Sequence, residues 1–475
     1  MGVQSREGCV VSMRSDPDGR ESWRWAEEGR ILEEALAELA GLFAREPAHQ
    51  PDWDAERVRS VLSRLALRLA DNYPYFHPLY AGQMLKPPHP VARLAWALAL
   101  TLNPNNHALD GGRATSQLEK ECIARLGGLF GWETVLGHLT GGGTLANLEA
   151  LWAGRELHPD RPAIVASTDA HYTHARMARL LGVPFIPVPV GADGAMNLDA
   201  LDRVLDRTAV GTVVATVGTT GWGAIDPVDG LVARRDRYPF RLHADAAYGG
   251  YFTLIRERLS RTARLRLEAV CACDSLAIDP HKHGLQPYGC GAILFRDPAV
   301  GSVYRHDSPY TYFTSSELHL GEISLECSRP GAAAAALWAT LELFPLVPDG
   351  PFAGQLWNSC RAARSLAGHL RAHPAWVILE EPELDILVFS IRSPRASALS
   401  RLNRAIFDRA AGGGLHLALL TIPTGRARPA LPDLDPDVDV VTVLRTCLMK
   451  PEHLEWCVQI FGHLEQARLA TARPA

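Results

Sequence analysis

The chain of 475 residues is predicted to fold as an α/β protein built on a mostly parallel sheet. Short runs rich in β-branched residues alternate with helical patterns through its middle, which is typical of parallel strands covered by helices. Hydrophobic residues make up 47% of the chain and charged residues 21%, so a sizeable core can be buried. Because a ligand in such a sheet lies outside the carboxyl ends of the strands, the loops after the strands are expected to carry the chemistry.

The expected elements of the middle region follow one another in regular order. Helices fit between many of the strands by their three- and four-residue apolar spacing. Strands are predicted over Ala163–Ser167, Phe185–Val190, Thr212–Val217, Arg241–Ala244, Ser275–Ile278 and Ala292–Phe295, and helices over Thr144–Arg155, His174–Leu181, Asp199–Asp206 and Val228–Asp236.

The flanking regions differ from this alternation. Ser116 followed three residues later by Glu119 predicts a capping box at the start of a helix through Phe130. After Pro351 the pattern mixes long helices with strands, which predicts a smaller α+β domain. The expected organisation is a flexible tail over 1–20, a helical N-terminal segment over 21–105, a large cofactor-binding domain over 106–345 and a small C-terminal domain over 346–475.

Charge and composition argue against several classes of function. The net charge is -5, so no basic field suggests nucleic acid or an anionic membrane as partner. The apolar stretches are too short or too interrupted to predict a membrane span or a secretory signal. Nine cysteines without metal-ligand spacing predict reduced thiols in a cytoplasm and no metal site.

Lysine is scarce in this chain, which gives weight to the few that remain: it occurs only at positions 86, 120, 282 and 450. Lys282 lies in the motif DPHKHG, just past the predicted strand Ser275–Ile278. A lysine at a strand end can be desolvated enough to lose its proton and condense with an aldehyde, which an arginine cannot do. The motif therefore points to a Schiff base between Lys282 and pyridoxal phosphate (PLP), with a solvated loop lysine as the alternative. His281 is expected to donate to the cofactor phosphate, and Asp279 is expected at the same site.

Two further motifs fit the same cofactor. Asp245 ends the predicted strand in LHADAAYGG, where a carboxylate can keep the pyridine nitrogen of PLP protonated, and Ala247 is small enough to lie beneath a flat ring. The glycines of LTGGGTLAN lead directly into a helix, whose first N–H groups can bind a phosphate. Gly142, Gly143 and Thr144 are the expected contacts. Taken alone, the aspartate fits a helix cap and the glycines fit a turn.

Residues after two other strands complete the candidate site. His171 follows the predicted strand Ala163–Ser167 and is expected to stack on the cofactor face and to hydrogen-bond the substrate carboxylate. Thr220 is expected to contact the ring hydroxyl. Asp226 is expected to hold His171 or the loop, and it is counted among the cofactor-binding residues. A structural helix-entry histidine and a Thr/Gly-rich turn are the alternatives for these two motifs.

Together these motifs resemble the group II PLP-dependent decarboxylases, the family of aromatic-amino-acid, glutamate and histidine decarboxylases. The likeness rests on TGGGTLAN, DAHYTHARMARLLG, ATVGTTGWGAIDP, LHADAAYGG and DPHKHGLQPYGCG, in that order along the chain. It implies the fold-type I architecture, an enzyme that decarboxylates an L-amino acid, and a homodimer with active sites at the subunit interface. It also implies a loop tyrosine that reprotonates the α-carbon, for which Tyr310 and Tyr312 are both candidates.

One departure from the family leaves the reaction more open. The residue after the Schiff-base lysine is often tryptophan in the family, whereas here it is His283, followed by Gly284. The same residues can support other PLP chemistry, because orientation decides which bond breaks. An aldehyde synthase or other oxidative variant, a lyase of phosphorylated amino alcohols, an aminotransferase and a catalytically inactive binding protein are therefore the alternatives.

Overall fold

A computed structural model describes residues 25–47, 53–305 and 324–472. The tail over 1–20 and the loop tyrosines Tyr310 and Tyr312 lie outside the described residues. The chain separates into two compact units, residues 1–54 and residues 55–475. Helix α1 (Trp25–Leu42) belongs to the first unit, and all other described elements belong to the second.

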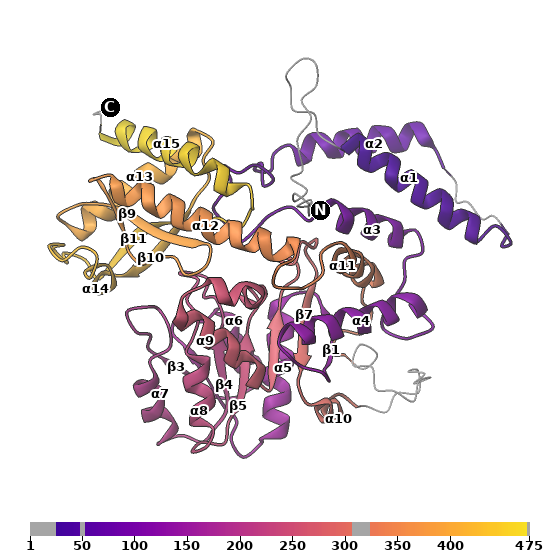
Figure 1. The fold of residues 1–475 in the computed structure, drawn as a ribbon, viewed down its shortest axis with the longest axis horizontal. Coiled ribbons are helices and arrows are strands. Elements are labelled where there is room, and N and C mark those ends of the chain that lie inside the picture. The colour runs from indigo at the N-terminus through magenta and orange to yellow at the C-terminus, as the bar shows by residue number, and fades with distance from the viewer. Residues whose placement is uncertain (1–24, 48–52, 306–323, 473–475) are drawn as a thin grey trace, which may run out of the picture. The chain divides into compact units, whose positions relative to one another are not determined.

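The second unit contains a seven-stranded sheet, several strands of which are labelled in the lower half of Figure 1. Its strand order is β1-β7-β6-β5-β4-β2-β3. The neighbours from β6 through β3 pair in parallel, and β7 runs antiparallel to both β1 and β6. The mostly parallel α/β fold predicted from the sequence is therefore confirmed. The strands are β1 (Leu136–Thr140), β2 (Ala163–Ser167), β3 (Phe185–Val188), β4 (Val210–Thr216), β5 (Arg241–Asp245), β6 (Ser275–Ile278) and β7 (Gly291–Phe295).

Helices cover this sheet and connect its strands. Helix α5 packs across β4, β5, β6 and β7, and α4 packs against β1 and β7. Short 3-10 helices occur at η1 (Gly250–Arg258), η2 (Ala269–Ala272) and η3 (Pro298–Val300). The α-helices are α4 (Arg113–Leu129), α5 (Gly143–Leu157), α6 (Thr173–Leu180), α7 (Leu198–Leu205), α8 (Val228–Arg234), α9 (Arg261–Glu268) and α10 (Gly301–Tyr304).

A second, antiparallel sheet lies in the C-terminal part, with the order β10-β11-β9-β8. Helices α12, α13 and α15 pack together beside it, visible in orange and yellow in Figure 1. The predicted smaller α+β arrangement is therefore present. Its elements are α12 (Pro351–Ala372), β8 (Trp376–Ile378), β9 (Ile386–Ile391), α13 (Ala396–Gly412), β10 (Ala418–Pro423), α14 (Thr424–Ala427), β11 (Val440–Cys447) and α15 (His453–Ala472).

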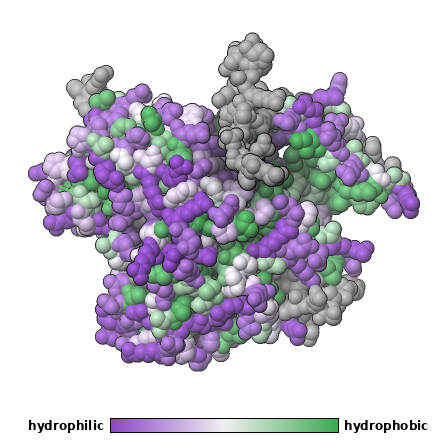
Figure 2. Space-filling view, viewed as in Figure 1, coloured by the Kyte–Doolittle hydropathy of each residue, from purple (hydrophilic) through white to green (hydrophobic). Residues whose placement is uncertain are grey.

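The remaining helices are α2 (Ala55–Leu69), α3 (Pro90–Leu100) and α11 (Gly331–Leu343), of which α3 and α11 pack against each other. Among the helices that the structure describes, none combines the length and the apolar composition of a membrane span. Hydrophilic side chains cover most of the face shown in Figure 2, with smaller apolar patches between them.

One sequence prediction around α4 is wrong, and one neighbouring strand was not predicted. Ser116 does not cap a helix, because α4 begins three residues earlier and Gly112 is its N-cap residue. Strand β1 was not predicted, because its sequence Leu-Gly-His-Leu-Thr has little β-branched character although all five residues are buried. Gly137 is required there, since a Cβ would lie 2.4 Å from Ile293 O on β7.

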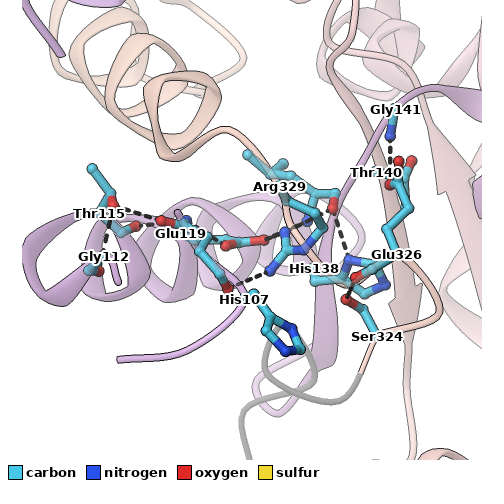
Figure 3. Close-up of polar contacts among 12 residues, drawn as sticks. His107, Gly112, Thr115, Glu119, His138, Thr140, Gly141, Ser324, Glu326 and Arg329 are labelled. Carbon is cyan, nitrogen blue, oxygen red and sulfur yellow. Dashed lines mark hydrogen bonds and ion pairs between the residues drawn. The ribbon is translucent and has the colours of Figure 1, made fainter. Parts of the chain in front are cut away.

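Glu119 instead anchors a buried ion pair that joins four segments of the chain (Figure 3). Its Oε1 accepts from Arg329 Nη1 at 2.5 Å and from Leu139 N at 2.8 Å, and its Oε2 accepts from Asn106 Nδ2 at 2.6 Å. Arg329 also donates to Leu139 O at 3.0 Å and to Asn106 O at 3.0 Å. The pair therefore fixes β1, directly before the glycine loop.

Breaking this buried pair should be far more damaging than breaking an exposed one. Glu119→Ala removes the buried carboxylate that pairs with the Arg329 guanidinium, so we expect a loss of about 3–5 kcal/mol in the free energy of unfolding. Glu342→Ala, the matched control, breaks the exposed pair with Arg125 and should cost less than about 1 kcal/mol. Urea unfolding followed by circular dichroism measures both; equal losses would contradict the assignment.

Candidate active site

A pocket with a volume of about 650 Å³ lies at the carboxyl ends of the parallel strands. The loops after β1, β2, β4, β5 and β6 each contribute to its lining, which is the position expected for a ligand in such a sheet. The predicted site residues that line it are Gly142, Gly143, Thr144, His171, Thr220, Asp245, Ala247, Asp279, His281 and Lys282.

Lys282 lies within this pocket, in the turn after β6, with its Nζ 3.0 Å from Asp279 Oδ2. Burial lowers the pKa of Lys282, yet the carboxylates of Asp279 and Asp245 outweigh burial and raise it above its usual value. Burial thus favours loss of the proton, as expected for a lysine at a strand end, while the two carboxylates favour the ammonium form. Asp279 Oδ2 is also the nearest described carboxylate that can take its proton.

Asp245 ends β5 and is almost fully buried. Its Oδ2 accepts a hydrogen bond from His174 Nε2 at 2.9 Å, and its Oδ1 accepts from Ala247 N at 3.3 Å. Burial alone would raise the pKa of this carboxyl, but the bond from His174 and the charge of Lys282 hold the pKa below its usual value. The pocket thus contains a carboxylate that stays ionised.

His171 is half-buried at the pocket wall, four residues after β2 ends. Its Nδ1 accepts a hydrogen bond from Thr173 N at 3.3 Å, so we assign the proton of the neutral ring to Nε2. Burial lowers the pKa of this imidazole, which favours the neutral form. His171 can therefore offer an N–H donor without carrying a charge.

The glycine loop comes close to the turn that holds Lys282. Gly142 has a φ of 148°, and a Cβ on Gly143 would lie 2.8 Å from Asp279 Oδ2, so both positions need glycine. No side chain caps the start of α5, which leaves its first N–H groups available to an anion. Asn147 Nδ2 donates to Gly143 O at 2.7 Å, and Asn147 Oδ1 lies 2.8 Å from His243 Nε2, which ties the loop to β5.

Buried polar atoms in the pocket indicate a polar ligand. Asp279 Oδ1 and Thr216 Oγ1 are buried and have no hydrogen-bond partner among the described residues. The uncapped helix start and the glycine loop can bind an anionic phosphate, and the ionised carboxylate and the lysine can bind a flat ring that carries an aldehyde. The residues of the pocket therefore fit PLP.

Asp226 does not line the pocket, in contrast to its predicted contact with the cofactor. It is fully buried, and its two oxygens accept from Met196 N and Thr216 N, each at 2.7 Å. Burial raises its pKa to about 7 against those two bonds. It therefore holds the end of β4 and does not reach His171.

His281 differs in detail from its predicted role. Its Nδ1 donates to Cys290 O at 2.8 Å, so its Nε2 can donate to a phosphate only when the ring is an imidazolium. Burial lowers the pKa of this ring. Its ring centroid lies 4.8 Å from that of Tyr288, which is 58% exposed at the pocket mouth.

Sequence analysis missed several residues of this site. His174 follows His171 by one helical turn and resembles any buried histidine, so no local signal separates it. Tyr248 and Tyr288 stand inside recognised motifs without a chemical cue of their own. Glu326, whose Oε2 accepts from Gly141 N at 3.0 Å (Figure 3), is distant in sequence from the glycine loop.

Comparison with known proteins identifies the family. Residues 73–392 match the pyridoxal-dependent decarboxylase conserved domain. The chain belongs to this family. The resemblance seen in the sequence is thereby confirmed, and the protein is a PLP-dependent amino-acid decarboxylase.

Individual relatives of this decarboxylase act on different amino acids. An L-aspartate decarboxylase of Thermococcus kodakarensis is 28% identical over 367 residues, covering 76% of this chain and 91% of the relative. An L-tyrosine decarboxylase of Enterococcus faecium is 27% identical over 472 residues, covering 76% and 77%. The crystal structure of Oryza sativa TDC with PLP and tryptamine has the same fold, with a TM-score of 0.76, 17% identity and coverage of 94% and 99%.

The attachment point of PLP can be tested directly in this decarboxylase. Borohydride should fix the cofactor to one lysine-containing peptide, the one with Lys282, because reduction makes a Schiff base permanent. Lys282→Ala should abolish both the label and the aldimine absorbance. Lys120→Ala, a lysine on α4, should keep them. Peptide mapping by mass spectrometry decides, and a full label in Lys282→Ala would refute the assignment.

Proposed function

We propose that this decarboxylase removes the α-carboxylate of an L-amino acid as CO₂ and releases the corresponding amine. The observation that carries the proposal is the convergence of Lys282, Asp245 and His171 in one pocket beside a glycine loop. PLP, when bound, supplies an aldehyde for amines and a ring that accepts the electron pair of the bond that breaks.

The residues that would hold PLP are those whose chemistry matches each part of it. We assign the phosphate to the uncapped start of α5 and the glycine loop, the ring nitrogen to Asp245 and the ring face to Ala247. An ionised carboxylate at the ring nitrogen favours the protonated ring. The full set of proposed cofactor contacts is Gly142, Gly143, Thr144, His171, Thr220, Asp245, Ala247, Asp279, His281 and Lys282.

Side chains of the protein transfer protons and bind the substrate carboxylate. Lys282 has to release a proton before its nitrogen can attack a carbonyl carbon, and Asp279 Oδ2 at 3.0 Å is the acceptor. The N–H on Nε2 of His171 is a neutral donor for the substrate carboxylate. Lys282, Tyr310 or Tyr312 returns a proton to the α-carbon.

A screen for CO₂ release tests this function. PLP-reconstituted enzyme offered each standard L-amino acid, including L-tyrosine and L-aspartate, should release CO₂ and an equimolar amount of amine from at least one of them. Asp245→Asn should keep the cofactor but lose activity about 100-fold or more, because the charge that supports the protonated ring is gone. Oxygen consumption with ammonia in place of the amine, or near-normal rates in Asp245→Asn, would contradict the proposal.

We also propose a homodimer that covers the mouth of the pocket. Tyr172, Leu180 and Tyr288 line that mouth and are 64%, 68% and 58% exposed. Helix α2 is itself amphipathic and exposes Leu62, Leu65 and Leu69 along one side. Exposed apolar surface of this kind supports association with a second copy of the chain.

Measuring the molecular mass in solution tests the proposed dimer. Light scattering should give twice the chain mass of 51.8 kDa. Leu62→Glu combined with Leu65→Glu should yield monomers with weak activity, because charges on this face cannot be buried against a partner. Ser60→Glu, a charge on the opposite side of the same helix, should leave the dimer intact. A wild-type monomer with full activity would refute the proposal.

A further inference from the structure

His174 is a fully buried histidine that belongs to the pocket's support and not to its lining. It lies one helical turn after His171, whose carbonyl accepts from His174 N at 3.2 Å. The two rings therefore serve different partners. His171 faces the pocket, whereas His174 Nε2 lies 2.9 Å from Asp245 Oδ2 on β5.

The protonation of His174 follows from its other ring nitrogen. Nδ1 is buried and has no hydrogen-bond partner among the residues that the structure describes. An imidazolium would leave a buried N–H without an acceptor, which is costly. Because a carboxylate oxygen can only accept, Nε2 carries a proton, and we assign the hydrogen bond as donated by His174 Nε2 to Asp245 Oδ2.

The other titratable groups around Asp245 are engaged elsewhere. On β5 itself, His243 has Nε2 2.8 Å from Asn147 Oδ1 and Nδ1 2.9 Å from Ser275 Oγ, and burial lowers its pKa to about 3. From the turn after β6, the ammonium of Lys282 pairs with Asp279 at 3.0 Å. From the start of α6, His171 accepts from Thr173 N. Among these groups, His174 alone hydrogen-bonds the Asp245 carboxylate.

We propose that His174 is a positioning residue: its Nε2–H orients Asp245 and keeps the proton of the PLP ring nitrogen from moving onto that carboxylate. The inference rests on the proposed function, in which Asp245 binds the ring nitrogen. A hydrogen bond donated to an ionised carboxylate lowers the affinity of that carboxylate for a proton. With a charged acceptor, the effect on the position of the proton is about 10- to 100-fold.

The test measures the ring nitrogen directly and needs no turnover. Enzyme reconstituted with PLP labelled with ¹⁵N in the ring reports, through the chemical shift, how far that nitrogen is protonated. The wild type should stay protonated between pH 6 and 9. His174→Leu and His174→Met remove the donor but keep apolar bulk, so the signal should move toward the unprotonated value. His174→Gln, which keeps an N–H donor, should restore most of the wild-type signal.

A matched control separates this role from the general loss of a buried histidine. His453 is also fully buried, and its Nδ1 accepts from Lys450 N at 3.2 Å. His453→Leu should leave the ring-nitrogen signal unchanged even if it lowers stability. Two donor-free variants at position 174 are used because one of them can fail to fold while the other packs.

The outcomes distinguish failure of the positioning role of His174 from failure of the proposed decarboxylation. A wild-type ring-nitrogen signal in folded His174→Leu or His174→Met would overturn the positioning role, and so would a glutamine variant that behaves like leucine. The signal is read without substrate, so it remains informative if no amino acid yields CO₂. In that case the proposed function fails while the role of His174 is still tested on its own.

Discussion

Asp245, a buried carboxylate whose pKa lies below its usual value, governs how the centre of this decarboxylase is built. An isolated charge at that depth would take up a proton, so the fold has to surround it with donors. Three neighbouring elements take part: α6 supplies His174, the turn after β5 supplies Ala247 N and the turn after β6 supplies the charge of Lys282. The same carboxylate helps to keep Lys282 an ammonium, so the charges of the pocket are mutually dependent.

The rest of the pocket is held by a polar framework beneath it. Glu119 and Arg329 fix β1 from one side, and His243 with Asn147 ties β5 to the carbonyl of Gly143. Both connections end at the glycine loop, where a displaced backbone would spoil an anion site. Geometry at the loop is thus set by buried hydrogen bonds, because glycines have no side chains with which to define their own position.

Much of this arrangement could be predicted from sequence, and the failures have physical causes. Strand ends carry their signal locally, so Lys282 and His171 were found in the loops after β6 and β2, and Asp245 was found at the last residue of β5. Contacts between distant segments carry no such signal. Glu119 has the spacing of a capping box, yet its partner is Arg329, 210 residues away. Strand β1 is fully buried, but its sequence has a low β propensity and so did not predict a strand. The sequence also does not show which charged groups lie beside a buried lysine. The carboxylate of Asp279, 3.0 Å from Lys282 Nζ, became evident only in the structure.

His283, the residue that departs from the family pattern, also lies beside a buried aspartate. It does not line the pocket; it is buried with its Nε2 3.3 Å from Asp385 Oδ2, and Asp385 Oδ1 accepts from Tyr248 OH at 2.6 Å. Asp385 directly precedes β9, so this pair joins the lysine turn to the C-terminal sheet. Asp245 and Asp385 are thus both buried aspartates that lie beside a histidine. His174 hydrogen-bonds Asp245, whereas the His283–Asp385 contact lacks hydrogen-bond geometry, and Tyr248 OH is the donor to the Asp385 carboxylate. The departure at position 283 therefore lies behind the pocket lining, in the support of the lysine turn.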